Sequence, residues 1–201
     1  MRLGIRIGPV AAAGAAALTF AAVATAATIT GTEGPDQIEG TDAADQIFAL
    51  GGNDVVEGER GNDQIDGGTG ADRLEGNRGA DGINGQDGRD ELRGGPANDT
   101  LSGGNGPDNV DGQDGNDTLN GDAGIDDLRD NKGADSFAGG TGADRVDARD
   151  SGGQTIGTTS DTVTCEGGDV VRADPDDVIV NRAACASVEL TSSGSGSSGS
   201  G

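Results

Sequence analysis

An aspartate recurs every nine residues through the middle of this chain, and no other feature of the sequence constrains the fold as much. Thirteen aspartates share this spacing without interruption: Asp36, Asp45, Asp54, Asp63, Asp72, Asp81, Asp90, Asp99, Asp108, Asp117, Asp126, Asp135 and Asp144. The residue two places later is always apolar: Ile38, Ile47, Val56, Ile65, Leu74, Ile83, Leu92, Leu101, Val110, Leu119, Leu128, Phe137 and Val146. A fixed period is typical of a solenoid, in which each repeat packs only against its neighbours.

Glycine follows the same period at two positions. It stands five residues before the aspartate except at Ala49 and Asp130, and two residues before it except at Ala43 and Ala97. The unit is therefore G-x-x-G-x-D-x-U-x, where U is apolar. Glycine permits turns and close backbone approach, so each unit predicts a turn followed by a short strand, x-U-x.

Alternation along a strand predicts where these side chains point. The apolar residue should face inward, and its mostly polar neighbours should face outward. One inward residue cannot make a core, but two successive repeats can face each other as a flattened coil of eighteen residues. We therefore expect an all-β solenoid of stacked coils, with parallel strands about 4.8 Å apart and the aspartates aligned in two rows.

Rows of aspartates need a counter-charge. Two carboxylates about 4.8 Å apart repel by roughly 1 kcal/mol in water and by about 3.5 kcal/mol at an effective dielectric of 20. Calcium accepts several oxygen ligands in irregular geometry, whereas magnesium needs a stricter octahedron and softer metals prefer Cys or His. The thirteen aspartates, with backbone carbonyls of the turns, are therefore predicted to bind calcium.

The unit resembles the hemolysin-type calcium-binding nonapeptide repeat, the RTX family, whose pattern is G-G-x-G-x-D-x-U-x. The closest segments are "GGTGADRLE", "GGNGPDNVD" and "GGTGADRVD". The resemblance implies a right-handed parallel β-roll of about 13 repeats over residues 27–148. Calcium would lie between stacked turns, held by aspartates eighteen residues apart, which gives up to about 11 ions.

Two departures from the family pattern bear on these sites. The second glycine of the unit occurs only at Gly68, Gly95, Gly104 and Gly140. Turns with an altered glycine position are expected to bind calcium weakly, and they contain Ala43, Ala49, Ala97 or Asp130.

Composition indicates how such a chain would behave without an ion. It has 36 acidic and 13 basic residues, a net charge of −23, and neither Trp nor Tyr. Strong charge with few large apolar residues predicts a largely disordered chain in the absence of calcium. The acidity also excludes binding to nucleic acid or anionic membrane through a basic patch.

The N-terminal segment, residues 1–26, has the layout of a secretory signal peptide. Arg2 and Arg6 precede an Ala-rich run that ends in small residues, with expected cleavage near Ala26 or Ala27. A single membrane anchor is the alternative, but an Ala-dominated run is weakly apolar for a spanning helix. We expect a secreted, extracellular protein, although RTX proteins are often exported without a cleaved signal.

Residues 149–190 are expected to cap the solenoid, since its last apolar rung needs a cover. The segment from Asp161 to Leu190 resembles the closing segment of actinobacterial calcium-binding repeat proteins. Its expected core comprises Val163, Val170, Val171, Val178, Ile179 and Val180. We expect a Cys165–Cys185 disulfide, with two separate thiols as the alternative, and a flexible Gly/Ser tail over residues 191–201.

These features favour a binding module over an enzyme. The chain has no His or Tyr and no segment outside the repeats that is large enough for a catalytic cleft. The leading hypothesis is a secreted, monomeric calcium-binding β-roll that folds on binding its ions, with no nucleic-acid partner and no membrane insertion after cleavage. The alternatives are a calcium-stiffened adhesin or cell-surface spacer, a repeat fragment of a larger secreted protein, and a disordered acidic spacer.

Overall fold

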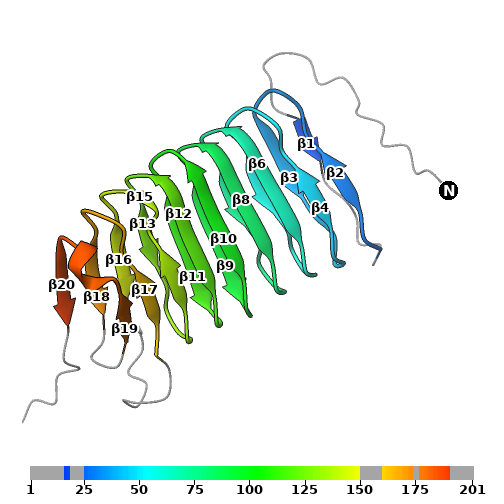
Figure 1. Ribbon diagram of the computed structural model, residues 1–201. Coiled ribbons are helices and arrows are strands. Elements are labelled where there is room, and N and C mark those ends of the chain that lie inside the picture. The colour runs from blue at the N-terminus through cyan, green and yellow to red at the C-terminus, as the bar shows by residue number, and fades with distance from the viewer. Residues whose placement is uncertain (1–15, 19–24, 150–159, 174–176, 191–201) are drawn as a thin grey trace, which may run out of the picture.

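A computed structural model describes residues 16–18, 25–149, 160–173 and 177–190. These residues form a β-solenoid of about eight coils, in which two parallel sheets face each other. Figure 1 shows the strands of successive coils side by side along one axis, from β2 at the blue end to β20 at the red end. The predicted all-β solenoid is confirmed.

Each sheet takes one strand from every coil. The first sheet runs in the order β1 (Ala16–Leu18), β3 (Asp36–Glu39), β5 (Val55–Glu57), β7 (Arg73–Glu75), β9 (Glu91–Pro96), β11 (Asn109–Asp114), β13 (Asp127–Arg129), β16 (Arg145–Ala148), β18 (Val170–Ala173) and β20 (Ser187–Leu190). The second runs β2 (Thr28–Thr30), β4 (Gln46–Phe48), β6 (Gln64–Gly70), β8 (Gly82–Gly88), β10 (Thr100–Asn105), β12 (Thr118–Gly124), β14 (Ser136–Ala138), β17 (Thr162–Thr164) and β19 (Val178–Val180). The short strand β15 (Thr141–Gly142) pairs with β12, and a 3-10 turn, η1 (Arg182–Ala184), precedes β20.

The strand register follows the eighteen-residue coil. Ile65 of β6 lies beside Ile83 of β8, which lies beside Leu101 of β10. All thirteen apolar motif residues are buried, with no more than 3% of any one exposed, and they form one core cluster. The single inward residue of each repeat therefore builds the core by stacking, as the alternation predicts.

The central strands are longer than the expected three residues. β6, β8 and β12 each span seven residues, and their pairing continues past the apolar rung into the turn, as in Gly68 beside Gln86 and Thr69 beside Asp87. The turns therefore stack by main-chain contact as closely as the strands do.

The C-terminal segment continues both sheets, and part of the predicted cap core is wrong. Val163 and Val171 are buried and Ile179 packs against the core. Val170, Val178 and Val180 are instead 43%, 52% and 43% exposed. The reason is strand alternation: each of these residues is next to an inward residue and so points outward.

The chain termini fall mostly outside the described residues. The expected signal segment, residues 1–26, includes β1, which pairs in parallel with β3; the expected tail, residues 191–201, is not among the described residues. Within the part of the chain that the structure describes, no helix is long and apolar enough to cross a membrane.

Candidate calcium sites

The motif aspartates lie in two stacked rows, each at the start of the strands of one sheet. The N–H of Asp72 donates to Oδ1 of Asp90 at 2.9 Å, and the carbonyl of Asp72 accepts the N–H of Glu91 at 2.8 Å. The same N–H to Oδ1 bond joins every pair of motif aspartates eighteen residues apart. The structure thus brings together the pairs that the period predicts.

This arrangement uses only one oxygen of most carboxylates. All thirteen side chains are buried, with no more than 4% of any one exposed. In ten of them Oδ2 is also buried and accepts no hydrogen bond from the described residues: Asp54, Asp63, Asp72, Asp81, Asp90, Asp99, Asp108, Asp117, Asp126 and Asp144. In Asp36 the unpaired atom is Oδ1, because Oδ2 accepts the N–H and the hydroxyl of Thr32. A buried carboxylate oxygen without a donor is costly, so each of these atoms calls for a counter-charge.

The glycine five places before the aspartate leaves room for this second oxygen. A Cβ added to Gly85 would stand 2.5 Å from Oδ2 of Asp90 and 2.5 Å from the carbonyl oxygen of Gly103 in the next coil. The two oxygens therefore lie within 5.0 Å of each other. Calcium binds oxygens at about 2.3–2.6 Å, so one ion could bridge them, and the oxygen-only donor set suits a hard cation.

The second glycine of the family unit marks a strained backbone position. At this position, four residues before the aspartate, φ is +87 to +126° at Gly68, Gly95, Gly104 and Gly140. It is also positive, at +67 to +81°, at several residues with side chains. Those residues are Leu50, Glu59, Asn77, Gln86, Gln113 and Asp122. Non-glycine residues in this region cost on the order of 1 kcal/mol each, so replacing glycine lowers stability while the turn shape is retained.

The pKa values of several motif aspartates are raised, in line with their buried, unpaired oxygens. Burial, and to a smaller extent neighbouring aspartates of the same row, raise the pKa of Asp63, Asp90, Asp99 and Asp126 from 3.8 to about 7, although a main-chain hydrogen bond to each carboxylate acts in the opposite direction. The pKa of Asp54 is raised to about 6 for the same reasons. The rows therefore resist full ionisation when no cation is bound.

Asp45, near the start of the second row, is an exception. Its Oδ2 accepts the N–H of Thr41 at 2.6 Å and its hydroxyl at 2.9 Å, and its Oδ1 accepts the N–H of Ala27 at 2.6 Å. Thr41 occupies the position at which the central coils have a left-handed residue. Protein donors therefore satisfy both oxygens of this carboxylate.

The C-terminal end has three row members that the nine-residue spacing did not predict. Asp161 and Asp169 extend the rows by accepting the N–H groups of Asp135 at 2.9 Å and Asp144 at 3.3 Å, and Asp177 accepts the N–H of Asp161 at 3.1 Å. The signal was a continued D-x-U pattern at irregular spacing, with Val163, Val171 and Ile179 as the apolar residues.

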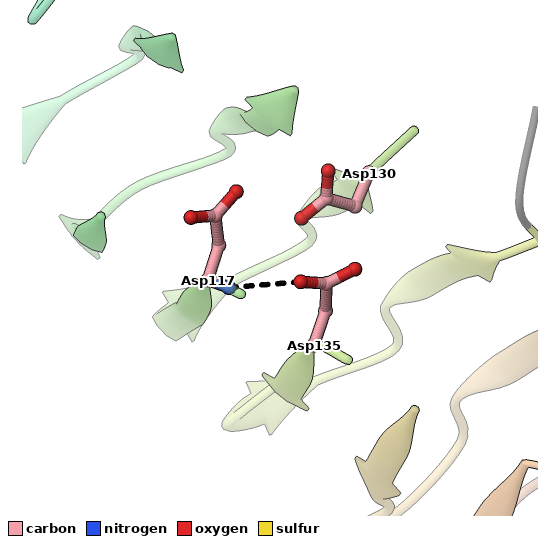
Figure 2. A group of neighbouring side chains, drawn as sticks. All are labelled: Asp117, Asp130 and Asp135. Carbon is pink, nitrogen blue, oxygen red and sulfur yellow. Dashed lines mark hydrogen bonds between the residues drawn. The ribbon is translucent and has the colours of Figure 1, made fainter. Parts of the chain in front are cut away.

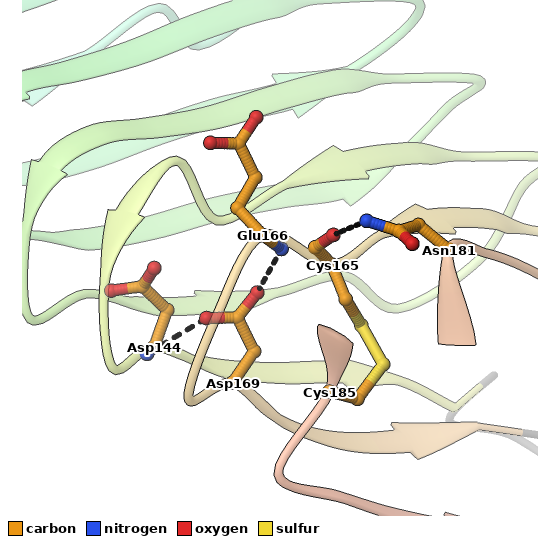
Figure 3. The surroundings of a disulfide bond; sticks show 6 residues. All are labelled: Asp144, Cys165, Glu166, Asp169, Asn181 and Cys185. Atoms are coloured by element: carbon orange, nitrogen blue, oxygen red, sulfur yellow. Dashed lines mark hydrogen bonds between the residues drawn. A yellow bond between two sulfur atoms is a disulfide. The ribbon is translucent and has the colours of Figure 1, made fainter. Parts of the chain in front are cut away.

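Asp169 is the last aspartate of its row, and both of its carboxylate oxygens accept hydrogen bonds from the chain. Its Oδ1 accepts the N–H of Asp144, and its Oδ2 accepts the N–H of Glu166 at 3.1 Å (Figure 3). Beside it, Cys165 and Cys185 form the expected disulfide, and the side-chain amide of Asn181 donates to the carbonyl of Cys165 at 3.1 Å. The cap is thus fixed by bonds that do not involve a metal.

Ala49 and Asp130 fill the place of the first glycine in different ways. Ala49 is fully buried and belongs to the core cluster. Asp130 is 7% exposed and lies beside Asp117 and Asp135, with one oxygen of each carboxylate within 4.8 Å of the others (Figure 2). Burial, Asp135 and Asp117 raise the pKa of Asp130 to about 10.

A solenoid with buried carboxylate rows facing carbonyl oxygens between its coils is a repeat protein suited to holding hard cations. The chain matches the family described as RTX calcium-binding nonapeptide repeat (4 copies) over residues 30–65, 57–92, 66–101, 93–128 and 121–150. It therefore belongs to this family, and its repeats fit a calcium-binding β-roll. A comparison with curated proteins found no match.

Proposed function

We propose that this chain is an exported β-roll that folds when calcium ions bind between its coils. The observation that carries the proposal is the buried Oδ2 of the central motif aspartates, which accepts no hydrogen bond from the described residues and faces a carbonyl of the next coil. These aspartates are Asp63, Asp72, Asp81, Asp90, Asp99, Asp108 and Asp126. Without cations, these carboxylates lose hydration and repel one another on folding. An ion that binds only the folded form stabilises it by about 2.7 kcal/mol per site at a hundredfold excess over Kd.

The proposed number of ions is smaller than the sequence predicts. Protein donors satisfy both oxygens of Asp45 and the gap-facing Oδ2 of Asp36, which accepts the N–H and the hydroxyl of Thr32. The pairs that begin with Asp36 and Asp45 therefore leave the expected set of eleven, and at most nine bridging pairs remain. The proposed binding module is a monomer. Its action would be binding and stiffening, not catalysis.

Export is supported by the signal-like segment, residues 1–26, and by the disulfide, which requires an oxidising or permissive environment. Extracellular calcium would then switch the chain from a disordered to a folded state. The proposal thus combines the site chemistry with a compartment that supplies its ion.

The test is a calcium titration followed by far-UV circular dichroism, with magnesium as the control ion. Folding by ion bridging predicts a cooperative gain of β signal with calcium and a much smaller gain with magnesium at equal concentration. A spectrum already ordered in chelator, or a coil at every calcium concentration, would refute the proposal.

A matched pair of variants sharpens this test. Asp90→Asn removes a charge where the unpaired oxygen faces Gly103, so we expect weaker calcium binding but a more ordered chain in chelator, since the amide can donate to that carbonyl. Asp45→Asn places an amide against the N–H of Thr41 or Ala27, so it should destabilise the fold whether or not calcium is present. Equal behaviour of the two variants would contradict the distinction.

A further inference from the structure

Asp130 stands where the repeat requires glycine, and its carboxylate enters the space between two coils. In a regular turn, a Cβ placed on the first glycine would lie close to Oδ2 of the aspartate of that turn and to a carbonyl oxygen of the next coil. For Gly94 the distances are 2.4 Å to Asp99 and 2.8 Å to the carbonyl oxygen of Gly112. A Cβ placed on Gly112 would have as its two nearest atoms Oδ2 of Asp130 at 2.4 Å and Oδ2 of Asp117 at 2.6 Å. A carboxylate oxygen thus replaces the usual carbonyl.

The two oxygens need a positive partner between them. Asp117 and Asp130 are 2% and 7% exposed, and their Oδ2 atoms accept no hydrogen bond from any described residue. When both carboxyl groups are ionised, both atoms are acceptors. A Cβ placed on Gly112 would lie 2.4 and 2.6 Å from them, so the two oxygens are within 5.0 Å of each other. The Oδ1 of Asp130 accepts the N–H of Asn131 at 2.6 Å, which directs its other oxygen into the gap.

The basic side chains next to Asp130 are engaged elsewhere. Arg129 pairs with Asp111 at 3.0 Å and Lys132 pairs with Asp114 at 2.8 Å, both on the outside of the solenoid. Neither pair reaches the interior carboxylates. Figure 2 shows Asp130 near Asp135, which belongs to the same turn, and Asp117 of the preceding coil beside them.

We propose that Asp130 is a metal ligand and that Asp117, Asp130 and Asp135 form a three-carboxylate cation site, the tightest in this chain. This inference rests on the proposed calcium-dependent folding and reverses the expectation that the turn with Asp130 binds weakly. A third carboxylate adds one negative charge to a shell that elsewhere holds two, and calcium affinity rises with the number of charged ligands. The site should therefore fill first and should accept trivalent lanthanide ions in preference to the others.

The test is a calorimetric calcium titration of the intact chain and three variants. Asp130→Asn keeps the side-chain shape but removes the charge, Asp130→Gly restores the repeat, and Asp114→Asn removes an exposed carboxylate of the adjacent coil as a control. We expect the wild type and Asp114→Asn to bind one ion at least about tenfold more tightly than the rest. Both Asp130 variants should lose this tight ion, and Asp130→Gly should keep the total number of bound ions.

A second measurement reads the ligand charge directly. The europium excitation line shifts with the summed charge of its ligands, so a line for a three-carboxylate site should appear in the wild type and in Asp114→Asn and be absent from both Asp130 variants. A tight ion retained in Asp130→Asn, or tighter binding by that variant, would overturn the inference and indicate a proton shared between the carboxylates. Calcium binding in a single class unaffected by Asp130 would overturn this inference alone, whereas no calcium binding by the wild type would overturn the proposed function as well.

Discussion

The ends of the solenoid and its middle solve the same electrostatic problem differently. At the N-terminal end, Asp45 receives hydrogen bonds from Thr41 and Ala27 on both oxygens, and at the C-terminal end Asp169 receives N–H groups from Asp144 and Glu166. In the middle, carboxylates such as Asp90 keep one buried oxygen without a donor among the described residues. The comparison suggests that the ends can be ordered by the chain itself, while the middle depends on cations.

The largest expected effect is that of pH on the stability of the middle coils without calcium, because many central carboxylates titrate in the same range. The raised pKa values of Asp54, Asp63, Asp90, Asp99 and Asp126 mean that the folded chain without calcium binds more protons than the unfolded chain between about pH 4 and 7. Its stability therefore falls as pH rises through this range. In chelator, circular dichroism should show more β structure near pH 5 than above pH 7.

Calcium should reverse this pH dependence. Protons compete with the ion for the same oxygens, so the calcium concentration at the folding midpoint should rise on acidification. Identical spectra in chelator at both pH values would show that the central carboxylates do not oppose folding.

Removing the disulfide should affect the C-terminal end by about 3 kcal/mol, since the bond closes a loop between residues 20 apart. The Cys165→Ser, Cys185→Ser double variant should unfold at lower urea concentration in calcium. Hydrogen exchange should locate the loss in β17 to β20, whereas the protection of β8 and β10 in calcium should change little. Uniform loss over all coils would contradict an independently fixed cap.

Thr41→Val tests the N-terminal end with an isosteric change. Valine removes one of the donors to Asp45 and the acceptor of the Ala43 N–H, at a cost of about 1–3 kcal/mol. Urea unfolding in calcium should show this loss. Thr118→Val, on the exposed face of β12, is the matched control and should change stability little.

The smallest effect is expected at Leu50, which holds φ at 79° on the turn of an early coil. Leu50→Gly relieves strain but increases the freedom of the unfolded chain, so thermal unfolding should show a gain of less than about 1 kcal/mol. Gly68, at the same position one coil later, gives the reverse comparison. Gly68→Ala should destabilise, because its Cβ would lie 2.0 Å from the carbonyl oxygen of Leu50.

The regular part of the molecule could be read from the sequence because its rule is local and repeated. A period of nine with one apolar residue per unit leads to coils of eighteen, to stacked rungs such as Ile65, Ile83 and Leu101, and to aspartates in rows. The cap was harder to predict. Its aspartates break the spacing, so the inward residue of each strand could not be told from neighbours such as Val170 and Val178, which are exposed.

The sequence by itself determined the solenoid, its core residues and the thirteen aspartates, since these follow from periodicity and strand alternation. Only the tertiary structure decided which carboxylates are satisfied by the chain and which face an open gap. Those outcomes depend on where two side chains point: the hydroxyl of Thr41 toward Asp45 in its own turn, and the carboxylate of Asp130 toward Gly112 in the neighbouring coil. A repeat pattern specifies which residue types recur, but the direction in which each of these side chains points is set by the packing of the folded turns.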